Sequence, residues 1–231
     1  LGHEFVGVID QVGSPDASTG ESQSTLFKVG QRVTAWPTLQ SEKCDLCKGG
    51  LANHCRQLRA LGQRGADGCL AERMSVPLNR LIALPDSLDD ETALFSQSLG
   101  TAIHAARLIA LEAQSFVTVL GDGVLGLLAA QVMSRRTAPV RLLPAQPAAL
   151  EVCAKLGLRH RETTLSGLRA DQDAVVECSG HADASALGMV RPRGSIIQAC
   201  PPGRALDLAD AWSAEIQLLC ARGCAMIEAV H

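Results

Sequence analysis

Hydrophobic and polar residues alternate along this chain with two different periods, and the period changes near Pro85. Before that proline, apolar and polar residues alternate over residues 5–12 and 32–36, the period of two that is typical of β-strands. Between them, residues 13–25 are polar and rich in Ser, Gly and Pro, which predicts a solvated loop. We therefore expect an all-β domain over residues 1–85.

Beyond Pro85 the pattern alternates between helices and apolar strands. Acidic residues at 89–91 precede a helical pattern over residues 94–111, as expected for the start of a helix. The later pattern predicts strands at 116–120, 140–143, 173–178, 195–199 and 216–221, and helices at 124–135 and 148–156. Such alternation is typical of a doubly wound parallel sheet, so the second domain, residues 86–231, is expected to be α/β.

A glycine-rich turn, Gly-Asp-Gly-Val-Leu-Gly, connects the strand at 116–120 to its helix. Gly121 permits a tight turn, Gly123 lets the backbone approach a pyrophosphate, and Gly126 lets the helix pack closely on the strand. The N–H groups at the start of the helix would bind the phosphates, although a turn that binds nothing is the alternative. The residues predicted to bind a dinucleotide are Gly121, Asp122, Gly123, Val124, Leu125 and Gly126, with Ser179 and Gly180 after a later strand.

The sequence leaves the choice between NAD and NADP open. A carboxylate about 20 residues past such a turn holds the ribose hydroxyls of NAD, and that position falls at about Pro144. An arginine there would suit the extra phosphate of NADP, but Arg141 lies within the strand. Either cofactor is therefore expected, and weak binding of both is a further alternative.

Three cysteines have the spacing of metal ligands in a segment of turn-forming residues. Cys44, Cys47 and Cys55 form a C-x2-C-x7-C pattern, and thiolates this close can converge on one tetrahedral zinc ion. A closed structural site has four ligands, and an evenly spaced fourth cysteine would stand where the chain has Ser41. The candidates to complete the site are Ser41, Glu42, Asp45 and water. Three reduced cysteines without a metal are the alternative.

Composition narrows the class of protein. The 231 residues are 47% hydrophobic and 19% charged, which is ordinary globular usage. The 9 cysteines are an odd number and several lie in apolar strands, which favours reduced thiols over disulfides. A net charge of −3 with 3% aromatic residues argues against nucleic acid as a partner. The apolar runs are far shorter than the ~20 residues that cross a bilayer, so we expect a cytoplasmic protein without a membrane partner.

Several short motifs occur in a fixed order along the chain. Leu-Gly-His-Glu-Phe-Val-Gly at residues 1–7 and Lys-Val-Gly-Gln-Arg-Val at 28–33 precede the cysteine loop, Asp-Gly-Cys-Leu-Ala-Glu at 67–72, and the glycine turn. Together they resemble the zinc-dependent medium-chain dehydrogenase/reductase family, which includes alcohol, sorbitol and threonine dehydrogenases. The resemblance covers nearly the whole chain. It implies a GroES-like β domain over residues 1–85 and a Rossmann domain with a parallel sheet over residues 86–231.

The resemblance also implies a catalytic zinc site. In the family the histidine of the first motif ligates zinc and the glutamate supports it, which implies these roles for His3 and Glu4. A further ligand, often acidic, falls at Gln97, and a neutral amide attracts zinc less than a carboxylate does, so we expect a weak or empty site. The catalytic residues implied are thus His3, Glu4 and Gln97, and the metal ligands implied are His3, Gln97, Cys44, Cys47 and Cys55.

The function implied is hydride transfer between an alcohol or polyol and NAD(P), with zinc polarising the oxygen. Two alternatives remain: a zinc-free, quinone-reductase-like NADPH oxidoreductase, favoured by Gln97 and Ser41, and a degenerate nucleotide-binding protein without turnover. The partner expected is a small alcohol or carbonyl substrate. The family's last strand pairs with its copy, so residues 216–221 are expected to join a homodimer or tetramer. Compared with the family, the chain appears as a piece that lacks an N-terminal part of the catalytic domain and a C-terminal return segment.

Overall fold

The computed structural model describes residues 1–13, 27–63, 65–137, 139–161, 169–180, 184–203 and 208–231. The loop expected at 13–25 therefore lies, apart from Gly13, outside the described residues. The chain forms two compact units, one of Leu1–Gln97 with Met226–His231 and the other of Ser98–Ala225. The domain boundary expected after residue 85 remains a prediction.

The first unit contains two small sheets. In one, β2 (Arg32–Ala35) pairs antiparallel with both β1 (Gly7–Val8) and β6 (Leu81–Ala83). In the other, β4 (Arg59–Leu61) lies between β3 (Thr38–Leu39) and β5 (Gly65–Ala66). Buried Ala35, Leu39 and Leu61 form an apolar cluster shared by the two sheets. This is the β-rich unit that the period of two predicts.

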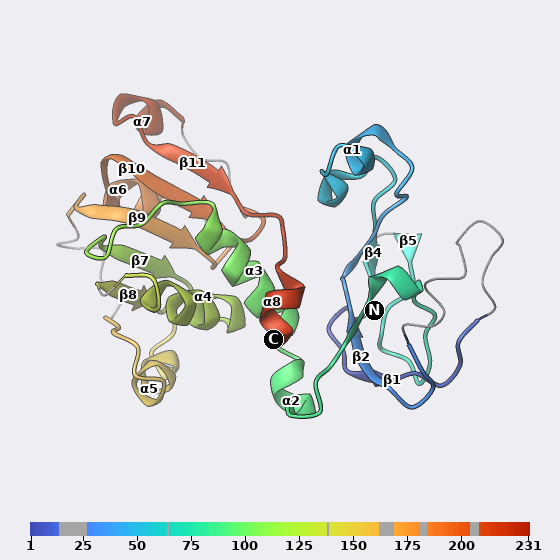
Figure 1. Cartoon of the computed structure of the whole chain (residues 1–231). Coiled ribbons are helices and arrows are strands. Elements are labelled where there is room, and N and C mark those ends of the chain that lie inside the picture. Colours follow the sequence, from blue (N-terminus) through green and yellow to red (C-terminus); the bar gives the residue numbers. More distant parts are fainter. Residues whose placement is uncertain (14–26, 64, 138, 162–168, 181–183, 204–207) are drawn as a thin grey trace. The chain divides into compact units, whose positions relative to one another are not determined.

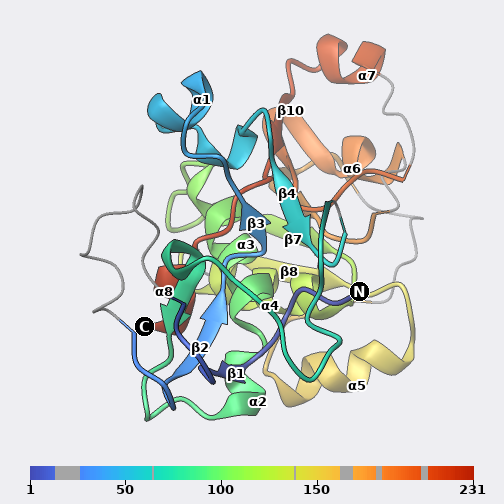
Figure 2. The ribbon, with the colours of Figure 1, turned by 90° about the vertical axis from the view of Figure 1, so that its right-hand side faces the viewer.

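The strand expected over residues 5–12 is shorter in the structure. Only Gly7–Val8 forms a regular strand, although Ile9 continues the pairing through its N–H to the carbonyl of Gln31, at 3.0 Å. The helices of this unit are short: α1 (Asp45–Lys48), α2 (Asp90–Ala93), α8 (Met226–Val230) and two 3-10 turns, Ala52–His54 and Leu78–Arg80. Within this unit, α1 lies at the opposite end from β1 and β2 (Figures 1 and 2).

The second unit is built on a five-stranded parallel sheet (Figure 1). Its strand order is β11-β10-β9-β7-β8, with strands at β7 (Val117–Leu120), β8 (Val140–Leu143), β9 (Gln172–Glu177), β10 (Val190–Gln198) and β11 (Gln217–Cys220). The helices are α3 (Ser96–Arg107), α4 (Val124–Ser134), α5 (Ala148–Lys155), α6 (Ala184–Met189) and α7 (Leu208–Ser213). The α/β fold with a parallel sheet is confirmed.

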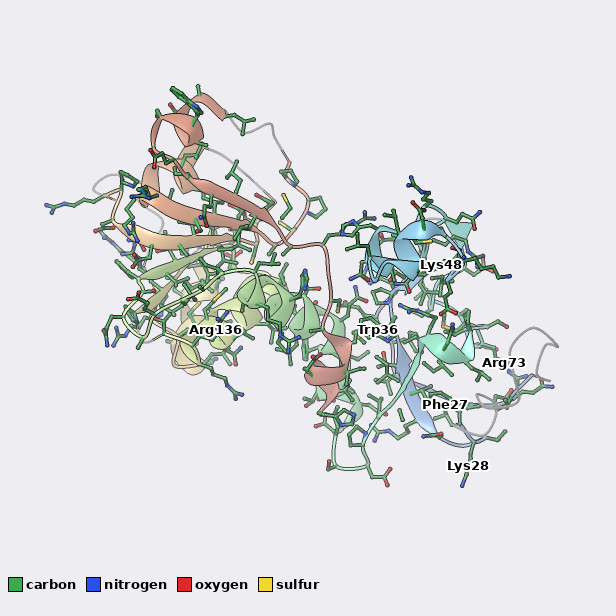
Figure 3. The ribbon with its side chains drawn as sticks, turned by 45° about the horizontal axis from the view of Figure 1, so that its top comes forward. Phe27, Lys28, Trp36, Lys48, Arg73 and Arg136 are labelled. Atoms are coloured by element: carbon green, nitrogen blue, oxygen red, sulfur yellow. The ribbon has the colours of Figure 1, made fainter. Side chains whose placement is uncertain are left out.

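Both faces of this sheet are buried, as expected for parallel strands. On one face, alternate residues of the strands pack with α3, α4 and α5; the buried residues include Ala105, Val119, Ala129, Leu142, Cys153 and Val176. On the other face, Val175 and Ile196 pack with Met189 of α6. Arg136, which is labelled in Figure 3, follows α4. It donates from Nη2 to the carbonyl of Ile109, which follows α3, at 3.3 Å.

Among the described residues, no helix combines the length and the apolar character that crossing a lipid bilayer requires.

Candidate nucleotide and metal sites

The glycine turn joins the carboxyl end of β7 to the start of α4. Gly121 has a φ of 104°, and a Cβ built there would lie 2.9 Å from the backbone nitrogen of Ser179. A Cβ at Gly126 would lie 2.1 Å from the carbonyl oxygen of Gly121, so close packing of helix on turn requires glycine. Glycine at these two positions allows the turn to pack closely against Ser179 and against the first turn of α4.

Gly123 has a different surrounding. A Cβ built there meets no atom within 4 Å, and Gly123 is the N-cap residue of α4, with no side chain that caps the first-turn N–H groups. Open space in front of uncapped N–H groups at a helix N-terminus suits an anion. The described residues of this turn therefore fit the pyrophosphate of a dinucleotide.

The adjacent strand β9 ends in a buried carboxylate. Glu177 is 1% exposed, and its Oε1 accepts hydrogen bonds from both the backbone N–H and the hydroxyl of Ser179, each at 2.5 Å. These bonds hold the 178–180 segment against the glycine turn, where Ser179 approaches Gly121. Burial, with the nearby thiol of Cys200 and carboxylate of Glu177, raises the pKa of Cys178, so that thiol stays protonated at neutral pH. The sequence predicts that Ser179 and Gly180 lie at this edge of the sheet. It does not predict the hydrogen bonds by which Glu177 holds Ser179.

The carboxyl end of β8 has no carboxylate of its own that could bind the ribose hydroxyls of NAD, and the side chain of Arg141 does not face the position of the extra phosphate of NADP. Pro144 follows the strand, and the guanidinium of Arg141 points toward the amino ends of the strands, away from the turn. It lies 5.0 Å from the ring centroid of Phe116, which precedes β7, and donates to the hydroxyl of Thr118 at 3.3 Å. Asp122 instead reaches the loop after β8, where its Oδ2 accepts from the N–H of Gln146 at 2.7 Å.

The three cysteines of the metal-spaced motif meet in space. Cys44 Sγ lies 3.4 Å from Cys47 Sγ and 3.9 Å from Cys55 Sγ, and within the described residues this is the one group of three or more His, Cys, Asp or Glu that could hold a metal. Sulfur ligands of a tetrahedral zinc ion, each about 2.3 Å from the metal, lie about 3.8 Å apart. The arrangement therefore fits three of the four ligands of one zinc ion.

Ser41 stands at the fourth corner of this group. Its Oγ lies 3.3 Å from Cys55 Sγ and 3.9 Å from Cys47 Sγ, and it accepts from the N–H of Cys44 at 3.4 Å. Of the other candidates, Asp45 pairs with Arg56 at 2.7 Å, and Glu42 accepts from Asn79. Ser41 is thus the candidate that lies against the sulfurs.

Hydrogen bonds around the loop favour the thiolate forms of Cys44 and Cys55. N–H donation from Arg56 and Cys47 lowers the pKa of Cys44 to about 6, and hydrogen bonding by Ser41 lowers the pKa of Cys55. Burial raises the pKa of Cys47. Because α1 begins at Asp45, Cys44 also accepts from the N–H of Cys47 as the helix cap. Lys48, labelled in Figure 3, ends this helix.

His3 and Gln97 come together although they are far apart in sequence. Nδ1 of His3 lies 3.1 Å from Oε1 of Gln97. The segment that carries His3 is held by Cys69, whose N–H donates to the carbonyl of Gly2 at 3.0 Å and whose thiol donates to the carbonyl of Glu4 at 3.4 Å. The motif at 67–72 marked this segment in the sequence without giving Cys69 that role. An imidazole and a neutral amide alone supply neither the number nor the charge of ligands that zinc needs.

Comparisons with known proteins identify the lineage of this chain. Residues 1–86 match the alcohol dehydrogenase GroES-like domain. The L-threonine 3-dehydrogenase of Chelativorans sp. (strain BNC1) is 33% identical over 195 residues, 79% of this chain and 54% of the relative. The chain belongs to the zinc-dependent medium-chain dehydrogenase/reductase family.

A second relative and a solved structure are also similar to this chain. The sorbitol dehydrogenase of Bacillus subtilis (strain 168) is 30% identical over 178 residues, 77% of this chain and 47% of the relative. The structure of L-idonate 5-dehydrogenase from Escherichia coli shares the fold, with a TM-score of 0.82 at 23% identity over 100% of this chain and 69% of that one. The chain spans about half the length of the curated relatives it matches.

Proposed function

We propose that the protein is an NAD(P)-dependent oxidoreductase that passes a hydride between a small alcohol or polyol and the cofactor. The observation that carries this proposal is the glycine turn, which combines close packing at Gly121 and Gly126 with open space at Gly123 before an uncapped helix. Membership of the medium-chain dehydrogenase/reductase family supports the same reaction class. When bound, the nicotinamide ring supplies or accepts the hydride.

The residues of the second unit bind and orient the cofactor in this proposal. The backbone of residues 121–126 holds the pyrophosphate, because the N–H groups at the start of α4 are directed at it. The segment of Ser179 and Gly180, fixed by Glu177, lines the nicotinamide end of the site. These roles follow from the position of both segments at the carboxyl edge of the sheet.

Zinc has two places in this proposal, and they differ in fit. Cys44, Cys47 and Cys55 hold a structural ion, with Ser41 beside them. His3 and Gln97 form an incomplete set, so we assign no catalytic step to zinc from the described residues. The uncharged Gln97 favours a second candidate function, a zinc-free, quinone-reductase-like NADPH oxidoreductase. Zinc analysis of the whole protein, with turnover measured on an alcohol panel and on quinones, separates the two functions.

We also propose a cytoplasmic homodimer or tetramer that assembles through β11. That strand is at the edge of the sheet. Beside it, residues of α7 and β11, with Glu215 and Ile216 between them, line an open groove of about 470 Å³, and Trp212 of this groove is 83% exposed. An unpaired apolar edge favours association.

Gly123→Ala tests cofactor binding. Because a Cβ at this position meets no protein atom, the variant should fold normally while its methyl group blocks the approach of the pyrophosphate. We expect fluorescence titration to show NADH or NADPH binding weakened at least about tenfold. Gly188→Ala, another site with no atom within 4 Å of the Cβ, is the matched control and should bind like the wild type. Failure of the wild type to bind either cofactor would refute the proposed function.

A further inference from the structure

The acidic group that reads NAD in a doubly wound sheet stands at the end of the strand next to the glycine turn. In this chain that position holds Pro144, which offers neither charge nor a donor. A carboxylate nevertheless reaches the same place from a different element. Asp122, the second residue of the glycine turn, extends from the end of β7 across to the loop that follows β8.

Two observations fix the position of this carboxylate. Strands β7 and β8 are neighbours whose last residues, Leu120 and Leu143, are paired in register. Asp122 Oδ2 accepts from the N–H of Gln146 at 2.7 Å, two residues beyond Pro144. The side chain therefore lies at the carboxyl edge between the two strands, where the adenosine ribose of a dinucleotide is held.

The second oxygen of Asp122 has capacity left for a ligand. The side chain is half-buried, and within the described residues Oδ1 accepts no hydrogen bond. An ionised carboxylate has about four acceptor sites, and one of them is used by Gln146. Two ribose hydroxyls are donors of the kind that the remaining sites accept.

The same position disfavours a phosphate. The negative charge of the Asp122 carboxylate would repel the 2′-phosphate of NADP, because like charges at close range raise the free energy of the complex. Arg141, the cation within β8 itself, is directed toward Phe116 and Thr118 and so away from the carboxyl ends of the strands.

We propose that Asp122 takes over the role of the missing acid at Pro144, accepts the ribose hydroxyls, and makes the protein selective for NAD over NADP. This inference rests on the proposed dinucleotide site and decides which cofactor enters it. The carboxylate that determines cofactor specificity thus belongs to the glycine turn and not to the end of β8.

The test compares the dissociation constants of NADH and NADPH, measured by nicotinamide fluorescence, for wild type and Asp122→Asn in the whole protein. We expect the wild type to bind NADH at least about tenfold more tightly than NADPH. Asp122→Asn removes the charge while keeping an oxygen for Gln146, so it should bind NADPH about tenfold more tightly and lose most of the selectivity. Glu112→Gln removes the same charge from an exposed site in the segment that precedes β7 and should leave the ratio unchanged.

The outcomes separate this inference from the proposed function. If the wild type binds both cofactors equally, or prefers NADPH, the role of Asp122 is refuted while the proposed oxidoreductase stands. The same holds if Asp122→Asn weakens both cofactors by the same factor with an unchanged melting temperature. If neither cofactor binds, the inference and the proposed function both fail.

Discussion

Ser41 occupies the corner of the cysteine loop at which a fourth thiolate would close a zinc site. Its hydroxyl is already 3.3 Å from Cys55 Sγ, so a sulfur at this position would lie in ligand range without a change of the loop. A neutral hydroxyl is a weaker zinc ligand than a thiolate because it carries no charge and remains protonated.

We predict that Ser41→Cys raises zinc affinity by about tenfold or more, since a thiolate completes the tetrahedral shell. Competition with a chromophoric chelator measures this. Ser41→Ala is the matched control and should retain zinc no better than the wild type. Equal retention by wild type and Ser41→Cys would show that the loop with serine is not impaired.

Gln97, like Ser41, is an uncharged side chain at a possible zinc site, here beside His3. The amide oxygen is 3.1 Å from the imidazole, a separation compatible with two ligands of one ion, but the pair carries no negative charge. We predict that Gln97→Glu increases the zinc content of the whole protein, measured by atomic emission, together with any alcohol-dependent reduction of NAD(P).

Gln63→Glu, an exposed substitution with the same charge change, serves as the control for Gln97→Glu. Full zinc occupancy in the wild type would contradict a degraded site. An unchanged zinc content in the Gln97 variant would favour the zinc-free reductase or the inactive relative.

At the scale of elements, continuous apolar runs predict the strands of the parallel sheet well. β8 agrees with the prediction at both ends, and β7 within one residue, because a parallel strand between helices is a continuous apolar run. β10 begins at Val190 rather than 195. Its first half contains Arg191, Pro192 and Arg193, which are exposed and lie within a shift of register, so the apolar pattern that marks a buried strand is absent there.

The candidate sites also differ in how far the sequence predicts them. The glycine turn and the cysteine loop are local, and spacing in the sequence was sufficient to find them. The contact of Asp122 with Gln146 joins two loops across a strand pair, and that of Cys69 with Gly2 joins distant segments; packing alone creates both. His3 and Gln97 were paired by resemblance to a family, since no periodicity connects residues 94 positions apart.

Asp173 links three strands and provides a test of their stability. Its Oδ2 accepts from the N–H of Phe116 at 2.7 Å, and its Oδ1 accepts from Arg191 at 2.8 Å. Burial by itself raises the pKa of this carboxyl, but the hydrogen bonds from Arg191 and Phe116 outweigh it and leave the pKa below its usual value. The ionised form is therefore favoured in the folded protein.

We predict that Asp173→Asn lowers the free energy of unfolding by about 1 kcal/mol at neutral pH, a value discounted for partial exposure. Because the folded pKa is depressed, this contribution is complete above about pH 5 and is lost as the pH falls below about 4. Urea denaturation of both proteins at several pH values measures it. Glu215→Gln removes an exposed ion pair with Arg193 and should change stability less. A difference that stays constant down to pH 3 would rule out this role of the charge.

At the scale of the whole molecule, each unit carries one kind of site: the cysteine loop and His3 lie in the first, and the glycine turn lies in the second. The proposed assembly concerns the second unit, because β11 is the outermost strand of its sheet among the described residues. Ala221 donates its N–H to the carbonyl of Gln198 at 2.8 Å. Since successive backbone groups of a strand point to opposite sides, the N–H of the exposed Cys220 faces away from β10.

This geometry allows the proposed pairing of β11 with its copy to be tested by removing one backbone N–H group, that of Cys220. Cys220→Pro removes an N–H that β10 does not use, and proline is tolerated at such edge positions, so the unit should fold while strand pairing between copies is weakened. We predict that light scattering shows an oligomer for the wild type and for Cys220→Ala, and a shift to monomer for Cys220→Pro. A wild type that is monomeric at all concentrations would refute assembly through β11. An oligomer that survives Cys220→Pro unchanged would move the interface away from this edge, because main-chain pairing between copies depends on the outward N–H groups that proline deletes.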